Sequence, residues 1–191
     1  MKLLHIDSSI MSEKSVSRGL SADVVTHIKN ANSDVSVTYY DLDTNPIPYF
    51  SSASFTDEKQ QALGELIMND FMTSDVIVIG APMYNFGIPA QLKSWIDRIA
   101  VAGKTFKYTE NGSVGLVSGK KVIIVSSRGG VYSGDLSFLD HQEAHLKAAF
   151  GFMGITDDDI TIIRAEGVNL GPSQAETAIK NAKSEISKLE I

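Results

Sequence analysis

The stretch VIVIGAPMYNFGIPAQLKSWIDRIA, residues 76–100, decides the fold class of this chain. It opens with an apolar run over residues 76–80, which is typical of a strand buried on both faces. From Ala90 to Ala102 apolar residues recur at helical spacing. The connection between the two patterns contains Met83-Tyr84-Asn85-Phe86, although Gly, Ser or Asp would turn the chain at lower cost. The stretch therefore predicts a strand and a helix, joined by a loop whose large side chains call for an explanation.

The same alternation of strand and helix extends over the whole chain. The predicted strands are Leu3–Ile6, Val35–Tyr40, Val76–Gly80, Val122–Val125 and Ile160–Arg164. The predicted helices are Ser17–Lys29, Asp57–Met72, Ala90–Ala102, about Asp140–Phe152 and Ser173–Leu189. Because the strands are apolar on both faces, this alternation predicts a parallel sheet that is covered by helices on each side.

The length of 191 residues and the 43% hydrophobic content predict one domain, spanning residues 1–191. We expect a flavodoxin-like three-layer α/β/α sandwich, with a five-stranded parallel sheet in the order 2-1-3-4-5. Strands 1, 3 and 4 are neighbours in that order, and ligands of such sheets bind beyond the carboxyl ends of the strands. The loops Asp7–Ser17, Pro82–Gly87 and Ser126–Gly134 should therefore form one site.

Composition excludes several classes of function. A net charge of -6 argues against nucleic acid as the main partner, because phosphate binding needs clustered Lys and Arg. Cysteine is absent, which excludes disulfides, thiol nucleophiles and thiolate metal sites. The apolar run at the N-terminus is too short for a signal peptide, and no later stretch approaches the length of a membrane span. We expect a cytoplasmic protein that binds neither nucleic acid nor membrane.

The first loop is rich in serine hydroxyls and ends where the first helix begins. Hydroxyls and free backbone N–H groups at the start of a helix form a phosphate cradle, although Ser15 or Ser17 can equally be a simple N-cap. The loop contains no glycine, so it lacks the dinucleotide-binding fingerprint, and no P-loop motif occurs in the chain. Asp41, at the distance of a ribose-binding acid, is interpreted as the end of a strand. The phosphate that this loop would bind is a terminal monophosphate.

The third loop contains the pair Gly129-Gly130. Paired glycines let the backbone approach a flat ligand and present N–H donors to it, and a simple turn explains them equally well. Together with Met83, Tyr84 and Phe86 they outline a slot for a planar heteroaromatic ring that carries a phosphate. FMN meets both requirements.

Several motifs give the chain an end-to-end resemblance to a known family. They are Ser8-Ser9, Ser15-Val16-Ser17, Asn45-Pro46-Ile47-Pro48, Ala81-Pro82-Met83-Tyr84-Asn85-Phe86, Gln91-Leu92-Lys93, Thr105-Phe106-Lys107-Tyr108-Thr109-Glu110-Asn111-Gly112, Ser127-Arg128-Gly129-Gly130 and Gly151-Phe152-Met153-Gly154-Ile155. With these motifs the chain resembles the FMN-dependent NADH-azoreductases, also described as FMN-dependent NADH:quinone reductases. The resemblance implies a homodimer with one FMN per subunit, in which NADH is the electron donor and quinones or aromatic azo compounds are the acceptors.

The resemblance also implies which residues bind. The implied FMN-binding residues are Ser9, Ser15, Val16, Ser17, Pro82, Met83, Tyr84, Asn85, Phe86, Ser127, Arg128, Gly129 and Gly130. Phe106, Tyr108 and Phe152 would wall the substrate pocket at the dimer interface. No catalytic side chain is required, because the flavin carries the chemistry in a ping-pong cycle, and no metal is expected. The segment Phe50–Thr56 is short for the family, which leaves the substrate range open.

Three alternative functions have weaker support in the sequence. His141 and His145 have the spacing of metal ligands, but Gln142 stands where the zincin glutamate would be and no third ligand is evident. Ser8 or Ser9 could be the nucleophile of an esterase or phosphodiesterase, but the G-x-S-x-G motif is missing. An electron carrier of the flavodoxin type is the remaining alternative, and its lack of NADH oxidation would distinguish it.

Overall fold

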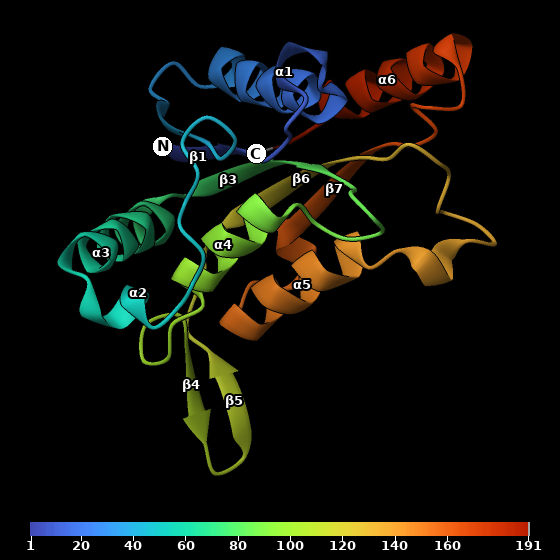
Figure 1. Cartoon of the computed structure of the whole chain (residues 1–191). Helices are drawn as coiled ribbons and strands as arrows, with labels where there is room; N and C mark the ends of the chain where they lie inside the picture. Colours follow the sequence, from blue (N-terminus) through green and yellow to red (C-terminus); the bar gives the residue numbers. More distant parts are fainter. Residues whose placement is uncertain (191) are drawn as a thin grey trace.

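The computed structural model of the chain describes residues 1–190 and contains one five-stranded parallel sheet (Figure 1). The strands of this sheet are β1 (Lys2–Asp7), β2 (Ser36–Asp41), β3 (Val76–Pro82), β6 (Lys121–Ser127) and β7 (Ile160–Ala165). The helices are α1 (Val16–Ala31), α2 (Ala53–Thr56), α3 (Glu58–Thr73), α4 (Ala90–Ile99), α5 (Gln142–Met153) and α6 (Pro172–Ile186). Each predicted strand and helix is present, and most boundaries lie within two residues of the prediction.

The strands follow one another across the sheet in the order β2-β1-β3-β6-β7. This order is consistent with the predicted 2-1-3-4-5 when only the strands of the main sheet are counted. Asp7 lies opposite Gly80, and Pro82 lies opposite Ser127, so β1, β3 and β6 end side by side. The loops that follow these three strands therefore leave the sheet at the same edge.

Helices cover both faces of the sheet, with α1 and α6 on one face and α3, α4 and α5 on the other (Figure 1). On β3, Ile77 and Ile79 belong to the core beneath α3, α4 and α5, whereas Val76 and Val78 belong to the core beneath α1 and α6. This strand is therefore buried on both faces, as its apolar run predicts. Trp95 of α4 is fully buried in the first core, where it packs against Phe71 and Phe150.

Strand β2 corrects the expectation that every strand is apolar on both faces. It is an edge strand of the sheet, and Val37 and Tyr39 are exposed. An edge strand has one neighbour and less helical cover, so the first four residues of β2 are exposed and only Tyr40 and Asp41 are partly buried.

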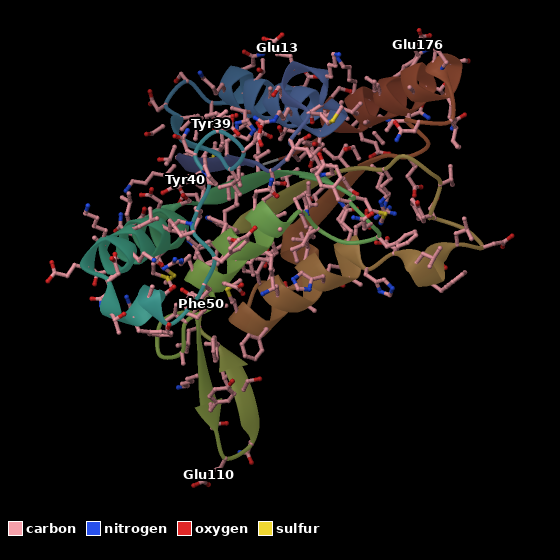
Figure 2. All side chains as sticks on the ribbon, viewed as in Figure 1. Glu13, Tyr39, Tyr40, Phe50, Glu110 and Glu176 are labelled. Carbon is pink, nitrogen blue, oxygen red and sulfur yellow. The ribbon has the colours of Figure 1, made fainter. Side chains whose placement is uncertain are left out.

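A two-stranded antiparallel hairpin of β4 (Phe106–Thr109) and β5 (Gly112–Gly115) interrupts the predicted alternation. It projects from the body of the molecule, with Glu110 at its tip (Figure 2). The helix before it ends at Ile99 rather than Ala102, because the hydroxyl of Thr105 donates to the Ile99 carbonyl at 2.6 Å and accepts from the Val101 N–H at 3.0 Å. Three single 3-10 turns complete the chain at Ser12–Lys14, Ser137–Leu139 and Asp157–Asp159. None of the helices within residues 1–190 has the length and apolar character needed to cross a membrane.

Candidate functional site

The loops after β1, β3 and β6 meet around one cavity of about 290 Å³ at the carboxyl edge of the sheet. The predicted binding residues that line it are Ser9, Ser15, Val16, Pro82, Met83, Tyr84, Ser127, Arg128 and Gly129. Four other predicted residues belong to the same loops without lining the cavity: Ser17, Asn85, Phe86 and Gly130. The sequence therefore predicts the location of this cavity and most of its walls.

The start of α1 gives the cavity the features of an anion site. Ser15 is the N-cap, and its hydroxyl accepts a hydrogen bond from the Arg18 N–H at 3.2 Å. The N–H groups of Val16 and Ser17 have no acceptor among residues 1–190, as expected for the first positions of a helix. The hydroxyl of Ser17 is buried and lies 3.1 Å from that of Ser15. Lys14, which sequence reasoning did not single out, lines the cavity beside these groups, so a cation and two free donors meet at the positive end of the helix.

Tyr84 connects the loop after β3 to the loop after β1. Its hydroxyl lies 3.2 Å from the hydroxyl of Ser9 and accepts a hydrogen bond from the Ile10 N–H at 3.2 Å. The Ser9 hydroxyl in turn accepts from the Met11 N–H at 3.2 Å. The side chain of Tyr84 therefore fixes the conformation of the serine loop.

The next two residues form a strained two-residue turn. Tyr84 and Gly87 exchange two backbone hydrogen bonds of 3.0 Å, and Asn85 and Phe86 between them have φ values of +49° and +71°. Both residues are thus left-handed, as in a type I′ turn, which favours Asn at the first position and Gly at the second. Phe86 is not a residue that such a turn selects. Its ring lies at the surface and packs edge-to-face with the ring of Tyr132, 6.1 Å between centroids, so the turn holds an aromatic ring against the loop that follows β6.

The side chain of Arg128 is directed into the protein. It is 1% exposed and pairs with Asp140, Glu143 and Glu166. Its Nε–H donates to the Ser126 hydroxyl at 3.0 Å. Because its guanidinium is paired with these carboxylates, Arg128 stabilises the loop from below. It is mainly the backbone of Arg128 that can contact a ligand in the cavity.

The two glycines of this loop have free backbone donors, since the N–H groups of Gly129 and Gly130 find no acceptor in the part of the chain that the structure describes. A Cβ on Gly129 would lie 2.6 Å from the side-chain nitrogen of Asn169. The missing side chain thus makes room for Asn169, which lines the cavity with Val168. Sequence reasoning missed both residues, although the strand order places the loop after β7 beside the loop after β6.

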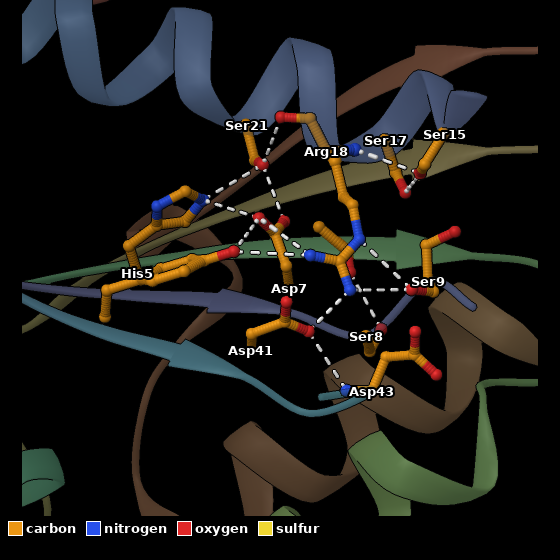
Figure 3. Close-up of polar contacts among 12 residues, drawn as sticks. His5, Asp7, Ser8, Ser9, Ser15, Ser17, Arg18, Ser21, Asp41 and Asp43 are labelled. Atoms are coloured by element: carbon orange, nitrogen blue, oxygen red, sulfur yellow. Dashed lines mark hydrogen bonds and ion pairs between the residues drawn. The ribbon is translucent and has the colours of Figure 1, made fainter. Parts of the chain in front are cut away.

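A polar cluster supports the serine loop from beneath (Figure 3). The guanidinium of Arg18 donates to the Ser9 carbonyl from Nε at 3.1 Å and from Nη2 at 2.7 Å, and its Nη2 lies 2.6 Å from Asp41 Oδ1. The hydrogen bond from Arg18 lowers the pKa of Asp41 to about 2. Burial, followed by the charge of Asp7, raises the pKa of Tyr39 to about 12. Asp41 does end β2, as interpreted, and it also anchors the residue that holds Ser9 in place.

The three predicted substrate residues lie together, away from this cavity. The ring of Phe106 lies 4.4 Å from that of Phe152 and 5.4 Å from that of Tyr108, centroid to centroid. None of the three lines the cavity at the sheet edge, whereas Phe106 and Tyr108 line a second cavity beside α3. Within one chain, the two predicted sets of binding residues therefore do not meet.

Comparisons with known proteins agree with this geometry. Residues 1–189 match the model of a family described by its flavodoxin-like fold. A protein of Chromobacterium violaceum named FMN-dependent NADH:quinone oxidoreductase is 49% identical over 204 residues, covering 100% of both chains. The structure of an azoreductase from Bacillus anthracis has a TM-score of 0.89 at 30% identity, covering 98% of this chain and 97% of that one. An FMN-dependent NADH-azoreductase of the same species, in complex with FMN, has a TM-score of 0.85 at 26% identity, with 98% of each chain covered.

Proposed function

The chain belongs to the flavodoxin-like family of FMN-dependent NADH:quinone oxidoreductases and azoreductases, and from this premise we propose that it catalyses their reaction. It uses NADH to reduce quinones and to cleave the azo bonds of aromatic azo compounds to amines, by two-electron transfer in a ping-pong cycle. Complete cleavage of an azo bond takes four electrons and therefore two molecules of NADH. The observation that carries the proposal is a cavity at the sheet edge in which an anion site and free backbone donors lie beside the side chains of Met83 and Tyr84.

The residues around the cavity fit FMN. The free N–H groups of Val16 and Ser17 and the cation of Lys14 suit a terminal phosphate, as the start of a helix generally does. Met83 and Gly129 also line the cavity, and a flat ring would lie against them. We assign FMN binding to the three loops on these grounds.

When bound, FMN supplies the transfer of hydride and electrons between NADH and the acceptor. The chain would bind and orient the reactants, and the free N–H group of Gly129, which lines the cavity, would stabilise negative charge gained on reduction. Arg128 and its carboxylate partners hold the backbone of this loop in position. No side-chain nucleophile takes part.

We also propose that the active enzyme is a homodimer with one FMN per subunit. Phe106, Tyr108 and Phe152 form an aromatic cluster away from the flavin cavity, and Tyr108 is 74% exposed on the projecting hairpin. A second subunit can present this cluster to the flavin cavity of the first, as the resemblance implies. The chain would act as one domain in the cytoplasm, where its electron donor is available.

Two measurements test the proposed function. The purified protein should be yellow, bind one FMN per chain and oxidise NADH when a neutral quinone is added. Lys14→Gln should weaken FMN binding about tenfold, because it removes a cation from the anion site, whereas Lys29→Gln, at the other end of α1, should leave binding unchanged. A colourless protein that does not take up added FMN would refute the proposal, and one-electron transfer without NADH oxidation would indicate an electron carrier.

A further inference from the structure

The second cavity has a volume of about 550 Å³ and lies between α3 and the segment that leads from α4 into the hairpin. Aromatic side chains stand on two of its sides. Phe50 and Phe55 come from the segment before α3, and Phe106 and Tyr108 come from the hairpin. Phe50 lies above the base of the hairpin in Figure 2. The cavity therefore has the volume and the aromatic lining to accept a planar aromatic ring.

A buried cation, Arg98 of α4, also lines this cavity. Arg98 is 3% exposed, and its hydrogen-bond partners among residues 1–190 are carbonyl and amide oxygens, with no carboxylate among them. It donates to the carbonyl of Pro48 at 3.1 Å, and to the backbone and side-chain oxygens of Gln60 at 3.3 and 2.9 Å. The buried side chain of Arg128, by contrast, has three carboxylate partners. Burial of a charge without a counter-ion is unfavourable, so Arg98 lacks the partner that a buried guanidinium ordinarily has.

Two N–H donors of Arg98 have no acceptor in the described residues, and one of them, on Nη1, lies near the position that a side chain at Gly64 would occupy. A guanidinium has five N–H donors, and the three hydrogen bonds to Pro48 and Gln60 leave the Nε–H and one Nη1–H without an acceptor in the described residues. Nη1 lies 3.9 Å from the position that a Cβ on Gly64 would occupy, and it is the one heavy atom of the described residues within 4 Å of that position apart from the helix's own nearby backbone and the residues next to Gly64. Because Gly64 also lines the cavity, its missing side chain opens the space next to Nη1. Lys104 adds a second cation to the lining, and Glu65 adds one carboxylate.

We propose that this cavity binds the acid-bearing end of an aromatic electron acceptor. A carboxylate or sulfonate would accept hydrogen bonds from Arg98, and the ring would lie between the aromatic pairs on either side. Phe106 and Tyr108, which the resemblance assigns to the substrate wall, line the cavity, and for this reason we identify the ligand with the acceptor. The inference rests on the proposed function and adds a substrate class to it: quinones and azo compounds with one acid group are preferred over neutral ones.

The first test measures binding to the FMN-loaded protein by calorimetry. Naphthalene-2-sulfonate is the acidic probe, and 2-naphthamide is its neutral counterpart. The sulfonate should bind more tightly than the amide and compete with the acceptor in steady-state kinetics. In Arg98→Met the affinity for the sulfonate should fall at least tenfold more than the affinity for the amide. Arg98→Lys keeps the charge, so its affinity for the sulfonate should lie between that of the wild type and that of Arg98→Met.

The second test uses a substitution that leaves the charge in place. Gly64→Leu fills the space beside Arg98 and replaces glycine in a helix by a better helix former, so we expect this variant to fold. It tests binding in the cavity even if Arg98→Met does not fold. It should abolish binding of both probes while the circular dichroism spectrum is retained. Asn69→Leu, on an exposed position of α3 outside the cavity, is the matched control and should bind both probes as the wild type does.

Kinetics separate the failure of this inference from the failure of the proposed function. The ratio of kcat/KM for 1,4-naphthoquinone-2-sulfonate to that for 1,4-naphthoquinone should fall at least tenfold in Arg98→Met. An unchanged ratio, or a sulfonate that binds without competing with the acceptor, overturns the inference and leaves quinone reduction intact. A protein that reduces neither quinone overturns the proposed function, and probe binding then stands as an independent result.

Discussion

Replacing Phe86 by alanine and by glycine measures the strain stored in the turn between β3 and α4. Phe86 has a φ of +71°, in the left-handed region. That conformation costs an L-residue about 1–2 kcal/mol, and glycine escapes this cost. Glycine ordinarily makes a protein less stable than alanine by about 0.5–1 kcal/mol, through the entropy of the unfolded chain. The left-handed turn should reverse this order, so Phe86→Gly should be more stable than Phe86→Ala by about 1 kcal/mol.

Both variants lose the same ring, which allows the strain to be measured separately. The ring of Phe86 is 42% exposed, so its removal should cost both variants about 1–2 kcal/mol of burial and of contact with Tyr132. For a chain of 191 residues, 1 kcal/mol corresponds to a difference in Tm of about 2–4 °C. The assay is thermal and urea unfolding at one protein concentration, with and without excess FMN. Because both variants lack the ring, kcat/KM should fall to the same extent in each.

Gly151 of α5 provides the matched control. It is exposed and has helical backbone, and apart from the helix's own nearby backbone and the residues next to Gly151, no heavy atom of the described residues lies within 4 Å of the position of its missing Cβ. Alanine at this position should therefore be more stable than glycine by about 1 kcal/mol, the opposite order from position 86. If Phe86→Ala proves as stable as Phe86→Gly, the turn stores no strain and the reasoning is wrong.

Three further predictions concern other contacts of the fold and the site. Tyr84→Phe removes the hydroxyl that contacts Ser9 and Ile10, and should raise the Kd for FMN about fivefold in a fluorescence titration, the equivalent of about 1 kcal/mol. The pKa of Asp41 is lowered from 3.8 to about 2 by Arg18, so its stabilisation is fully present above pH 3.8 and is lost as the pH falls through 2. Asp41→Asn should lower the free energy of unfolding at pH 7 by about 1 kcal/mol, after allowance for solvent screening, and should flatten its pH dependence between those two values; an unchanged acid profile would contradict this. Gly115→Ala would place a Cβ against the backbone of Met153 and Gly154, and should lower the free energy of unfolding by about 2–3 kcal/mol; a neutral result in urea unfolding would show that the hairpin can shift away from α5.

The sheet could be predicted because its signals are local. A strand such as β3, buried on both faces, reads as an apolar run wherever it lies in the sheet, and the handedness of crossovers then restricts the strand order. The hairpin could not be predicted in the same way. Its strands are four residues long, and in β4 only Phe106 is buried, so neither shows the alternation that marks a half-buried strand. The resemblance pointed to these residues as a motif without indicating that they form a hairpin.

The candidate site was predicted at the level of loops rather than of side chains. Three strand ends at one edge follow from the strand order, whereas the direction of each side chain depends on tertiary contacts. Arg128 illustrates the difference, because an arginine in a predicted anion-binding loop resembles a ligand contact until its three carboxylate partners are known. Those partners lie 12 to 38 residues away in the sequence, and no local pattern connects them. The sequence therefore places such a residue near the site, but it does not indicate whether the guanidinium contacts the ligand or pairs with carboxylates of the protein.

Arg98 shows how far the same limit extends. It lies three residues after Trp95 and directly before Ile99, both fully buried, so helical geometry alone places it at the border of the apolar face of α4. A border position is ordinarily one from which a long cationic side chain reaches solvent. Here Phe50 and Gln60, which precede Arg98 by 48 and 38 residues, cover the guanidinium, and the missing side chain of Gly64 leaves space beside Nη1. The residues that bury this charge are distant from Arg98 in the sequence, so no local pattern indicates the burial. The proposed binding role of Arg98 therefore rests on the folded structure and not on a sequence motif.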